Sequence, residues 1–387
     1  MFSKLRTRFS VIALFVCAAS ACHFPDDPDL SAGWSGVDRP ITHSFTRVLD
    51  LQYAPDGGLL AAWANVRDGF CLVVSRMDDP ASTMVSLGSI GSGQQVKLAV
   101  INAKGATLQA AWWEAGYIVS AEYSQGAWTE QRRYALEGDD PIVALAFYQD
   151  EPVFGIYKNR ASKVVWWRNG AWTEFEIIND FRGAFSNPTR IGVNETSVYF
   201  FIPEQNQIWF FNASTAASGF SYTNMTGSLD VIAETGPGDF RFINYDYNSG
   251  ASSIKGYHLT TNGILSVNLP YRSFNIGSSE KGEHALMSAC PLPDATLLAW
   301  ADGSEDDPQL DGGPSALSTF DSSGDWKSGK LSTVLVKNDG SLYGLATGFS
   351  AGGVRDIRTA VRDNQVTIAY SDAGFLFGMV LAWRSFP

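Results

Sequence analysis

The sequence predicts an all-β fold, a β-propeller of seven four-stranded blades closed by an N-terminal strand that completes the last blade. Three observations predict it. Short apolar strand runs repeat at a period near 45 residues, Gly-x-Trp turns follow several of them, and an unfinished C-terminal repeat matches a spare strand near the N-terminus. A period of roughly 40 to 50 residues is typical of four-stranded propeller blades.

The second strand of each repeat carries the clearest pattern, an apolar run with Ala, Gly or an aromatic residue. These strands are expected at residues 59–64, 108–113, 152–157, 197–202, 240–245, 296–301 and 365–370. The runs are short and rich in Val, Ile and aromatic residues, which favours strands over amphipathic helices. A pair of β-sandwiches or a β-helix could use the same strands, but neither fits the period and its turns.

A first strand is expected before each of these runs and a third strand after it. The third strands are predicted at residues 70–76, 117–123, 163–167, 207–212, 253–259, 316–320 and 375–383. Three are followed by the turns Gly126-Ala127-Trp128, Gly170-Ala171-Trp172 and Gly324-Asp325-Trp326. Gly permits a positive φ in a tight turn, and Trp begins a fourth strand whose large apolar side chain can pack between blades.

The two ends of the chain predict how the ring closes. The last repeat stops at Pro387 without a fourth strand, whereas Gly33 and Trp34 begin a segment that resembles one and continues to Ile41. We therefore expect the N-terminal strand to complete the last blade, which removes two exposed sheet edges. Residues 338–353 could form either a long loop or part of another blade, so the blade number stays open.

The first 22 residues have the pattern of a targeting segment. Lys4, Arg6 and Arg8 precede an apolar run at residues 11–18, and small residues at 19–21 precede Cys22. This ending resembles the signal of bacterial lipoproteins, in which the cysteine becomes the lipidated first residue of the mature chain. Ala19 departs from that pattern, where Leu is commoner, and ordinary secretion after cleavage at residue 21 is the alternative.

The lipoprotein resemblance implies a signal peptide at residues 1–21 and a lipidated tether at 22–32, and the repeats predict a single propeller domain at 33–387. His23 follows the cysteine in place of the Asp that retains such proteins at the inner membrane, so the outer membrane is expected in a Gram-negative cell. Cys71 and Cys290 then remain in the folded part. Their predicted positions in different blades are too far apart for a disulfide, so we expect two buried free thiols.

The net charge of −12 limits the classes of partner. It argues against nucleic acid and anionic lipid surfaces as electrostatic partners. We expect a protein or glycan partner, contact with the membrane only through the Cys22 lipid, and a monomeric chain. Most Trp residues fall in strands or turns, where packing between blades is a better explanation than stacking on sugars.

One turn resembles a known family. Residues 318–326, from Ser318 to Trp326, are similar to a degenerate Asp-box of the sialidase-like propellers, with one residue too many between Asp321 and Gly324. In that family the Asp-box is a structural turn, so the resemblance implies fold and not activity. The family's Arg-Ile-Pro motif is missing, because Arg190-Ile191 is followed by Gly192.

No motif predicts a catalytic site. The four His residues lack the spacing of a zinc site, and no nucleophile elbow, Walker loop or dinucleotide fingerprint occurs. One loop has a composition that could bind Ca²⁺ or another ligand, because carboxylate oxygens are the ligands Ca²⁺ prefers. Its acidic residues are Asp302, Glu305, Asp306, Asp307 and Asp311. An ordinary solvated acidic loop is the alternative.

Two functions follow from these patterns. The first is a non-catalytic binding or scaffold propeller of the cell envelope that presents its loops to a partner. The second is a propeller enzyme that acts on an extracellular polysaccharide. Two or more carboxylates that converge with an Arg or His at the centre of the ring would favour the enzyme.

Overall fold

The computed structural model describes the chain over the following residues: 34–36, 40–42, 45–65, 71–90, 96–103, 105, 107–114, 116–136, 142–158, 161–178, 190–193, 197–202, 207–212, 217–222, 228–236, 239–246, 251–259, 265–267, 272–274, 287–303, 329–337, 342–347, 354–372 and 378–386. Every secondary-structure element in these ranges is a β-strand. Among the described residues there is no helix that is long and apolar enough to cross a membrane. The predicted all-β class is therefore confirmed.

The described strands form seven antiparallel sheets, which we number as blades in chain order. Blades one to three are β1 (Thr46–Tyr53), β2 (Leu59–Asn65), β3 (Leu72–Met77) and β4 (Val85–Ile90); β5 (Val96–Asn102), β6 (Leu108–Glu114), β7 (Tyr117–Ser124) and β8 (Ala127–Ala135); and β9 (Ile142–Tyr148), β10 (Glu151–Lys158), β11 (Ala161–Arg168) and β12 (Ala171–Ile178).

The remaining blades follow the same order. Blades four and five are β13 (Arg190–Val193), β14 (Ser197–Ile202), β15 (Gln207–Asn212) and β16 (Ala217–Tyr222); and β17 (Ser228–Gly236), β18 (Asp239–Asp246), β19 (Ala251–Leu259), β20 (Leu265–Val267) and β21 (Arg272–Phe274). Blades six and seven are β22 (Met287–Pro291), β23 (Ala295–Gly303), β24 (Gly329–Lys337) and β25 (Leu342–Thr347); and β26 (Val354–Arg362), β27 (Gln365–Asp372) and β28 (Gly378–Ser385).

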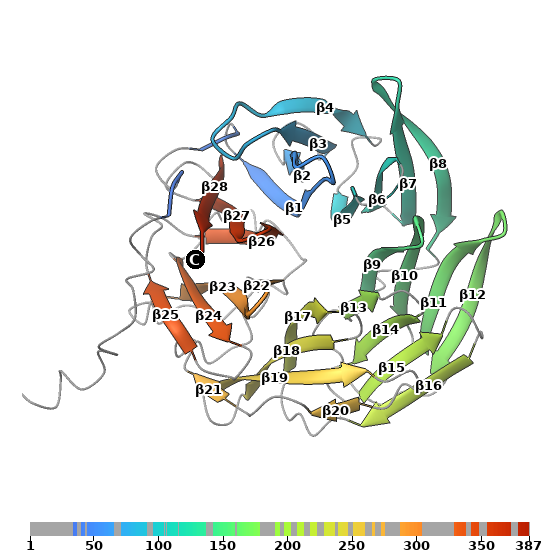
Figure 1. Cartoon of the computed structure of the whole chain (residues 1–387). Helices are drawn as coiled ribbons and strands as arrows, with labels where there is room; N and C mark the ends of the chain where they lie inside the picture. The colour runs from blue at the N-terminus through green and yellow to red at the C-terminus, as the bar shows by residue number, and fades with distance from the viewer. Residues whose placement is uncertain are drawn as a thin grey trace, which may run out of the picture.

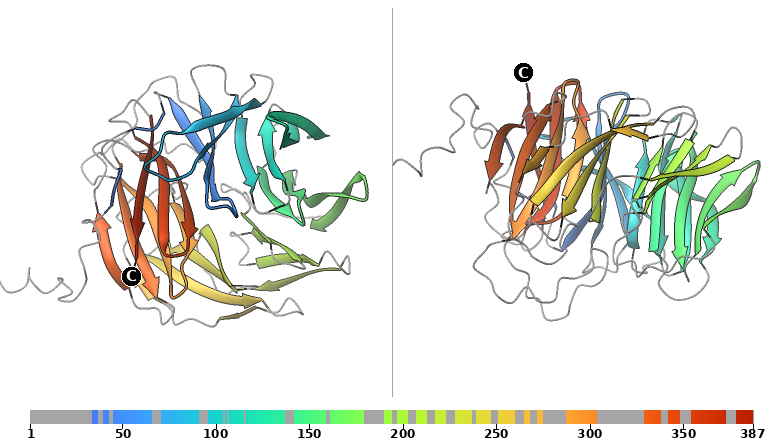
Figure 2. Two further views of the ribbon diagram at one scale, coloured as in Figure 1. Left: turned by 45° about the horizontal axis from the view of Figure 1, so that its top comes forward. Right: turned by 90° about the horizontal axis from the view of Figure 1, so that it is seen from below.

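The blades stand around a ring with their first strands innermost (Figure 1). Each first strand neighbours the first strand of the next blade, and β26 neighbours β1, so the circle closes. Consecutive strands pair antiparallel outward from the centre, and they run between the two faces of the ring (Figure 2). This arrangement is a β-propeller.

The turns within the sheets define the two faces. Turns that join first to second strands and third to fourth strands lie on one side, which we call the turn face. Connections that join second to third strands, and one blade to the next, lie on the other side, which we call the loop face. This division follows from the antiparallel order of every sheet.

The period of the sequence located the second strands correctly. All seven predicted runs coincide with a strand of the structure, to within two residues at either end. The strands β2 and β27 are buried along most of their length, as expected for runs covered by a blade on each side.

Blade six differs from its prediction. The second strand β23 pairs directly with β24, from Ala295 opposite Lys337 to Gly303 opposite Gly329, and β25 is the fourth strand. The third strand expected at 316–320 is therefore wrong, and the Asp-box-like segment 318–326 precedes the third strand instead of following it. Residues 304–328 lie outside the described part of the chain.

Packing explains why the third strand of blade six lies further along the chain. The strand β24 has nine residues and pairs with the whole of β23. Its alternating residues Leu331, Thr333 and Leu335 are buried. The earlier segment 316–320 offers only five residues. The position of β25 also shows that residues 342–347, whose role the sequence left open, belong to blade six.

The Gly-x-Trp turns of blades two and three have the predicted geometry. Gln125 and Gly126 have φ values of 52° and 81°, and Asn169 and Gly170 have 53° and 80°. Two consecutive residues with positive φ are typical of a type I′ hairpin turn. The Trp172 side chain then packs against Phe154, with ring centroids 5.4 Å apart, in the cluster shared by blades two and three.

A bulge in β8 lets one strand pack against two neighbours. Trp128 and Tyr134 are an even number of residues apart, so a regular strand would place both on one face. The pairing shifts at Ala121, which is opposite Glu130, while Ser120 is opposite Arg132. As a result Trp128 packs in the cluster between blades one and two, and Tyr134 packs in the cluster between blades two and three.

The N-terminal segment completes blade seven, as predicted. We call residues 34–36 and 40–42 the strap. Ser35 and Trp383 exchange backbone hydrogen bonds of 3.0 and 3.1 Å, and the Ile41 amide donates to the Met379 carbonyl at 2.6 Å. The Trp34 side chain is buried in the cluster between blades six and seven. The strap therefore covers the edge of β28 that would otherwise be exposed.

The two cysteines of the described residues are free thiols, as expected. Cys290 lies within β22 and is buried, whereas Cys71 precedes β3 and is only partly buried. The strong burial predicted for both thiols therefore holds for Cys290 alone.

Candidate functional site at the centre of the ring

Polar side chains on β1 bind the open backbone edge of β5. The Ile101 amide donates to Asp50 Oδ2 at 2.7 Å, and Gln52 Nε2 donates to the Ile101 carbonyl at 2.7 Å. The Ala103 amide also donates to Gln52 Oε1, at 3.4 Å. Innermost strands have no sheet partner on the side of the axis, so these side chains satisfy backbone groups that water or a ligand would otherwise have to satisfy.

Asp50 is fully committed to these contacts. Its second oxygen, Oδ1, accepts a hydrogen bond of 2.8 Å from the Leu51 amide. Burial raises the pKa of the Asp50 carboxyl above its ordinary value of 3.8, and the amide bonds and the charge of Arg358 oppose this rise. A raised pKa suits an acid catalyst, but the Asp50 carboxyl accepts hydrogen bonds from two backbone amides, which is typical of a structural carboxylate.

The seam between blades seven and one contains the second central group. Arg358 Nε donates to the Leu49 carbonyl at 2.7 Å, and its NH1 donates to the Ile357 carbonyl at 2.7 Å. Burial lowers the pKa of the Arg358 guanidinium, while the charges of Asp356 and Asp50 oppose that effect. Arg47 pairs with Asp356 across the same seam at 3.5 Å.

Irregular backbone makes these seam contacts possible. The pairing of β1 with β2 shifts between Val48 and Asp50, and the pairing of β26 with β27 shifts between Arg355 and Arg358. Asp356 itself has a φ of 48°, a conformation that L-residues seldom adopt. Bulges re-aim side chains, and here they bring the polar groups of two first strands together.

Similar links join other neighbouring blades. Ser288 of β22 and Thr359 of β26 share a hydrogen bond of 2.9 Å between their hydroxyls. Asn102 Nδ2, at the end of β5, donates to Asp150 Oδ1 in the first turn of blade three at 2.8 Å. We call the links among β22, β26, β1, β5 and blade three the central girdle.

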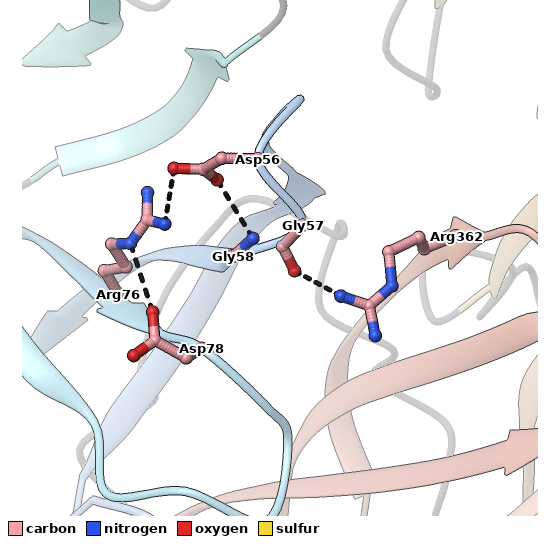
Figure 3. A network of polar contacts seen from close by, with 6 residues as sticks. All are labelled: Asp56, Gly57, Gly58, Arg76, Asp78 and Arg362. Carbon is pink, nitrogen blue, oxygen red and sulfur yellow. Dashed lines mark hydrogen bonds and ion pairs between the residues drawn. The ribbon is translucent and has the colours of Figure 1, made fainter.

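On the turn face, a further network joins blades one and seven (Figure 3). Arg362 NH1 donates to the Gly57 carbonyl at 2.5 Å, which ties the end of β26 to the first turn of blade one. Within blade one, Arg76 forms an ion pair of 2.6 Å with Asp56, which also accepts a bond from the Gly58 amide at 3.1 Å. The Arg76 hydrogen bond lowers the pKa of the exposed Asp56 carboxyl.

Arg362 also stacks on an aromatic ring of blade one. Its guanidinium carbon lies 5.0 Å from the centroid of Tyr53, whose hydroxyl shares a 2.7 Å hydrogen bond with Thr367 of β27. The two blades at the ends of the chain are therefore joined by hydrogen bonds, by a cation–π contact and by the strap.

A further buried carboxylate lies near the loop face of blade two. Glu114 Oε2 accepts a hydrogen bond of 2.9 Å from Trp112 Nε1, and Arg133 NH2 is 3.8 Å from its other oxygen. Arg133 also lies 5.0 Å from the centroid of the Tyr117 ring. Arg133 pairs more closely with Glu130, at 2.8 Å, so the short bond of Glu114 is the one to Trp112 within β6.

These contacts decide what the described centre can do chemically. Carboxylates and arginines converge there, as the enzyme hypothesis requires, and their bonds go to backbone groups or to a neighbouring charged side chain. Among the described residues, no group of three or more His, Cys, Asp or Glu side chains is arranged to hold a metal ion. The geometry supports a structural role for the girdle.

The residues proposed from the sequence as a binding loop are mostly outside the described part. Asp302 lies near the end of β23, opposite Lys330 of β24. Glu305, Asp306, Asp307 and Asp311 belong to the connection 304–328 between these strands, and Cys22 precedes the strap; neither segment is described. Ca²⁺ binding by this loop therefore stays a prediction.

Sequence reasoning missed the girdle. Its signal was a charged or amide residue inside an otherwise apolar first strand, as with Asp50 and Gln52 in β1 and Arg358 in β26. The prediction for the Trp residues was better. Trp112 is 1% exposed and packs between blades one and two, and Trp166 is 5% exposed and packs against Tyr148 of its own blade.

Comparison with known proteins supports the fold. No protein-family model matches the sequence, and no curated protein matches it either. Among solved structures, the β-propeller domain of Cps50 (Swd1) from Myceliophteria thermophila is similar over 90% of this chain and 99% of that one, with 9% identity and a TM-score of 0.57. The WD40 repeats of RRP9 are similar over 93% and 99%, with 12% identity and a TM-score of 0.57.

A chain of a mitotic checkpoint complex is also similar, over 94% of this chain and 97% of that one, with 10% identity and a TM-score of 0.53. At such low identities the similarity concerns the fold alone. The fold of this chain is a β-propeller.

Proposed function

We propose that this protein is a non-catalytic β-propeller of the bacterial cell envelope, anchored by a lipid on Cys22, that binds a protein partner. In a Gram-negative cell the anchor lies in the outer membrane, and the chain acts as a monomer. The central girdle is the observation that supports a non-catalytic role. In it, Asp50, Gln52 and Arg358 form hydrogen bonds with backbone groups of neighbouring blades.

The anchor rests on the sequence. A positively charged start, a short apolar run and the small residues before Cys22 have the order of a lipoprotein signal. Propeller loops commonly carry binding residues on a rigid scaffold, and one similar structure belongs to a mitotic checkpoint complex, a protein assembly. A glycan is the second class of partner.

The test is capture of the partner from the native envelope. Cells that express the tagged full chain are treated with a mild cross-linker, and the tagged protein is purified from the membrane fraction. The matched control carries Cys22→Ser, which removes the lipid site and leaves residues 34–386 unchanged. A protein recovered with the wild-type chain, and bound again when both purified components are mixed, would support the proposal.

The enzyme hypothesis makes a different forecast in the same experiment. Enrichment of a polysaccharide that the purified chain then cleaves would refute a non-catalytic role. Asp50→Asn distinguishes the two interpretations further, because a structural Asp50 affects stability and leaves any such cleavage by the folded protein intact.

A further inference from the structure

We infer that the edge of β28 is a binding site for an extended peptide segment of the partner protein, and that the strap occupies this site in the free chain. This inference rests on the proposed protein partner, and it adds the surface and the chemistry by which that partner is recognised. A peptide that replaces the strap becomes the fourth strand of blade seven, which is recognition by β-strand addition.

The edge of β28 directs backbone groups toward the strap. Ser35 and Trp383 exchange two hydrogen bonds, and the Met379 carbonyl accepts a third from the Ile41 amide. The Met379 amide donates to a side chain instead of a backbone carbonyl, namely Thr42 Oγ1, at 2.8 Å. Because the groups that β28 contributes are backbone groups, an extended peptide of another sequence can bond with them in the same way.

The strap pairs with this edge irregularly. Ser35 lies opposite Trp383, and Pro40 lies opposite Val380. The strap thus advances five residues while β28 covers three, so it bulges between the two bridges. Gly36 supplies a positive φ of 84° where this bulge begins. On its other side β28 pairs regularly with β27 over eight positions, so a regular strand could also follow the edge that the strap covers.

The connection from the strap to blade one is strained. Phe45 has a φ of 63°, a conformation that L-residues seldom adopt. The chain bends sharply there, since the hydroxyl oxygens of Thr42 and Thr46 are 2.7 Å apart. When the strap leaves β28, Phe45 is free to adopt an ordinary conformation, which favours the open state. Segments near the ends of a chain also open at a low free energy, so the strap can be exchanged for another strand.

The side chains of the strap define which peptide fits. Trp34 is 8% exposed, and its ring lies 6.3 Å from that of Phe386 in the cluster between blades six and seven. Two residues further on, a Cβ at Gly36 would overlap the ring of Trp383. Ile41 packs against the cluster between blades seven and one. A peptide with an aromatic residue, a glycine two positions later and an aliphatic residue near its other end would reproduce these contacts.

The outer edge of the strap is a poor alternative site. Ile41 directs its amide to β28, so the preceding residue, Pro40, turns its backbone nitrogen away from β28. Proline has no amide hydrogen to donate, and prolines on an edge strand oppose the addition of a further strand. Within blade seven, a partner strand is therefore expected at β28 itself, in place of the strap.

The test measures, by fluorescence anisotropy, how a labelled synthetic peptide of residues 33–42 binds the full chain with Cys22→Ser. The strap must open before the peptide binds, so the apparent affinity is reduced by the small fraction of open chains. Trp34→Ala in the full chain removes the buried side chain that holds the strap, and should tighten peptide binding by roughly tenfold or more. The control Trp172→Ala removes a partly buried Trp outside the strap and should leave peptide binding unchanged.

A second peptide with Trp34→Ala lacks the aromatic side chain and should bind roughly tenfold more weakly. A photoreactive phenylalanine at the same position should cross-link to blade six or seven. If the Trp34→Ala chain does not fold, Gly36→Ala supplies a second chain with a weakened strap, because its Cβ meets Trp383. No binding of the first peptide to a folded chain of this kind, equal binding of both peptides, or cross-links to other blades would overturn the inference.

Competition connects this site with the partner. The peptide in excess should displace the protein captured from the envelope, and that protein should bind the Trp34→Ala chain more tightly than wild type. A captured protein that binds without competing would overturn this inference and leave the proposed function intact, whereas failure to capture any protein would overturn both. A strap of one copy cross-linked to β28 of another would assign the site to a second copy of this chain and overturn the assignment to a partner.

Discussion

Gly36 gives the sharpest test of how the ring closes. It has a φ of 84°, and a Cβ added there would overlap the ring of Trp383 and the carbonyl oxygen of Leu381. Gly126 has nearly the same φ, 81°, and a Cβ there would meet nothing within 4 Å. Replacing each glycine by Ala therefore imposes a similar φ strain at two sites whose packing differs.

The expected magnitudes follow from these two terms. A left-handed backbone conformation costs an L-residue about 1–2 kcal/mol, so Gly126→Ala should lower the free energy of unfolding by that amount. Overpacking adds about 1–3 kcal/mol, so Gly36→Ala should lower the free energy of unfolding by about 2–5 kcal/mol. The difference between the variants measures the contact between the strap and β28.

The assay is urea unfolding of both variants, followed by tryptophan fluorescence, in a Cys22→Ser background that keeps the chain off membranes. Equal losses in the two variants would refute the reasoning, because they would mean that Gly36 does not lie against Trp383 in solution. A larger loss for Gly126→Ala would refute it more strongly.

Further predictions concern the seams and the thiols. Burial raises the pKa of Asp50 above 3.8, so the stability contributed by the protonated carboxyl is present below pH 3.8 and is lost as pH rises through the raised pKa. The difference in free energy of unfolding between wild type and Asp50→Asn, measured by urea unfolding, should therefore shrink as pH increases, and growth of that difference would contradict this prediction. Arg362→Ala, which removes the bond to the Gly57 carbonyl and the stacking on Tyr53, should cost about 1–3 kcal/mol. The control Arg168→Ala, which loses a cation–π contact within its own blade, should cost about 0.5–1 kcal/mol; urea unfolding compares the two variants, and equal costs would argue against the contribution of Arg362. With Cys22 replaced by Ser, a thiol reagent at pH 8 should modify Cys71 in the folded chain and leave Cys290 intact, because burial raises the pKa of Cys290 to about 12. Rapid modification of Cys290 would show that blades six and seven separate.

The repeat pattern was sufficient to predict the fold because every blade buries its second strand. An apolar run such as that of β6 can be recognised in the sequence, because its burial depends on the architecture and not on one particular partner. The strap was predictable for a related reason. An incomplete last blade needs one more strand, and Trp34 marked the segment that could supply it.

Partners chosen at long range escaped prediction. Which backbone group Asp50 binds depends on β5, 51 residues away, and Arg358 binds Leu49 across 309 residues of chain. Neither of these separations along the chain can be predicted from the repeat period of about 45 residues. The prediction for blade six failed because the connection 304–328 lengthens the interval between the second strands β23 and β27, from Ala295 to Gln365, to 70 residues against a period near 45. A short apolar segment within that connection was therefore assigned as the third strand in place of β24.

The candidate binding loop shows what a composition can and cannot establish. Its carboxylates point to a cation by chemistry alone, and only Asp302 falls in the described residues, within the pairing of β23 and β24. The girdle residues, in contrast, became interpretable only through their contacts. Their hydrogen bonds indicate that these charged residues hold neighbouring blades together.

The measurement that tests the account most directly is mass spectrometry of the mature N-terminus, purified from the native membrane. We predict that the mature chain begins at Cys22 and carries diacylglycerol on this residue, and that the added mass of the lipid is absent from the Cys22→Ser chain. A mature chain that begins at an unmodified Cys22, or that retains the first 21 residues, would contradict the proposed anchor.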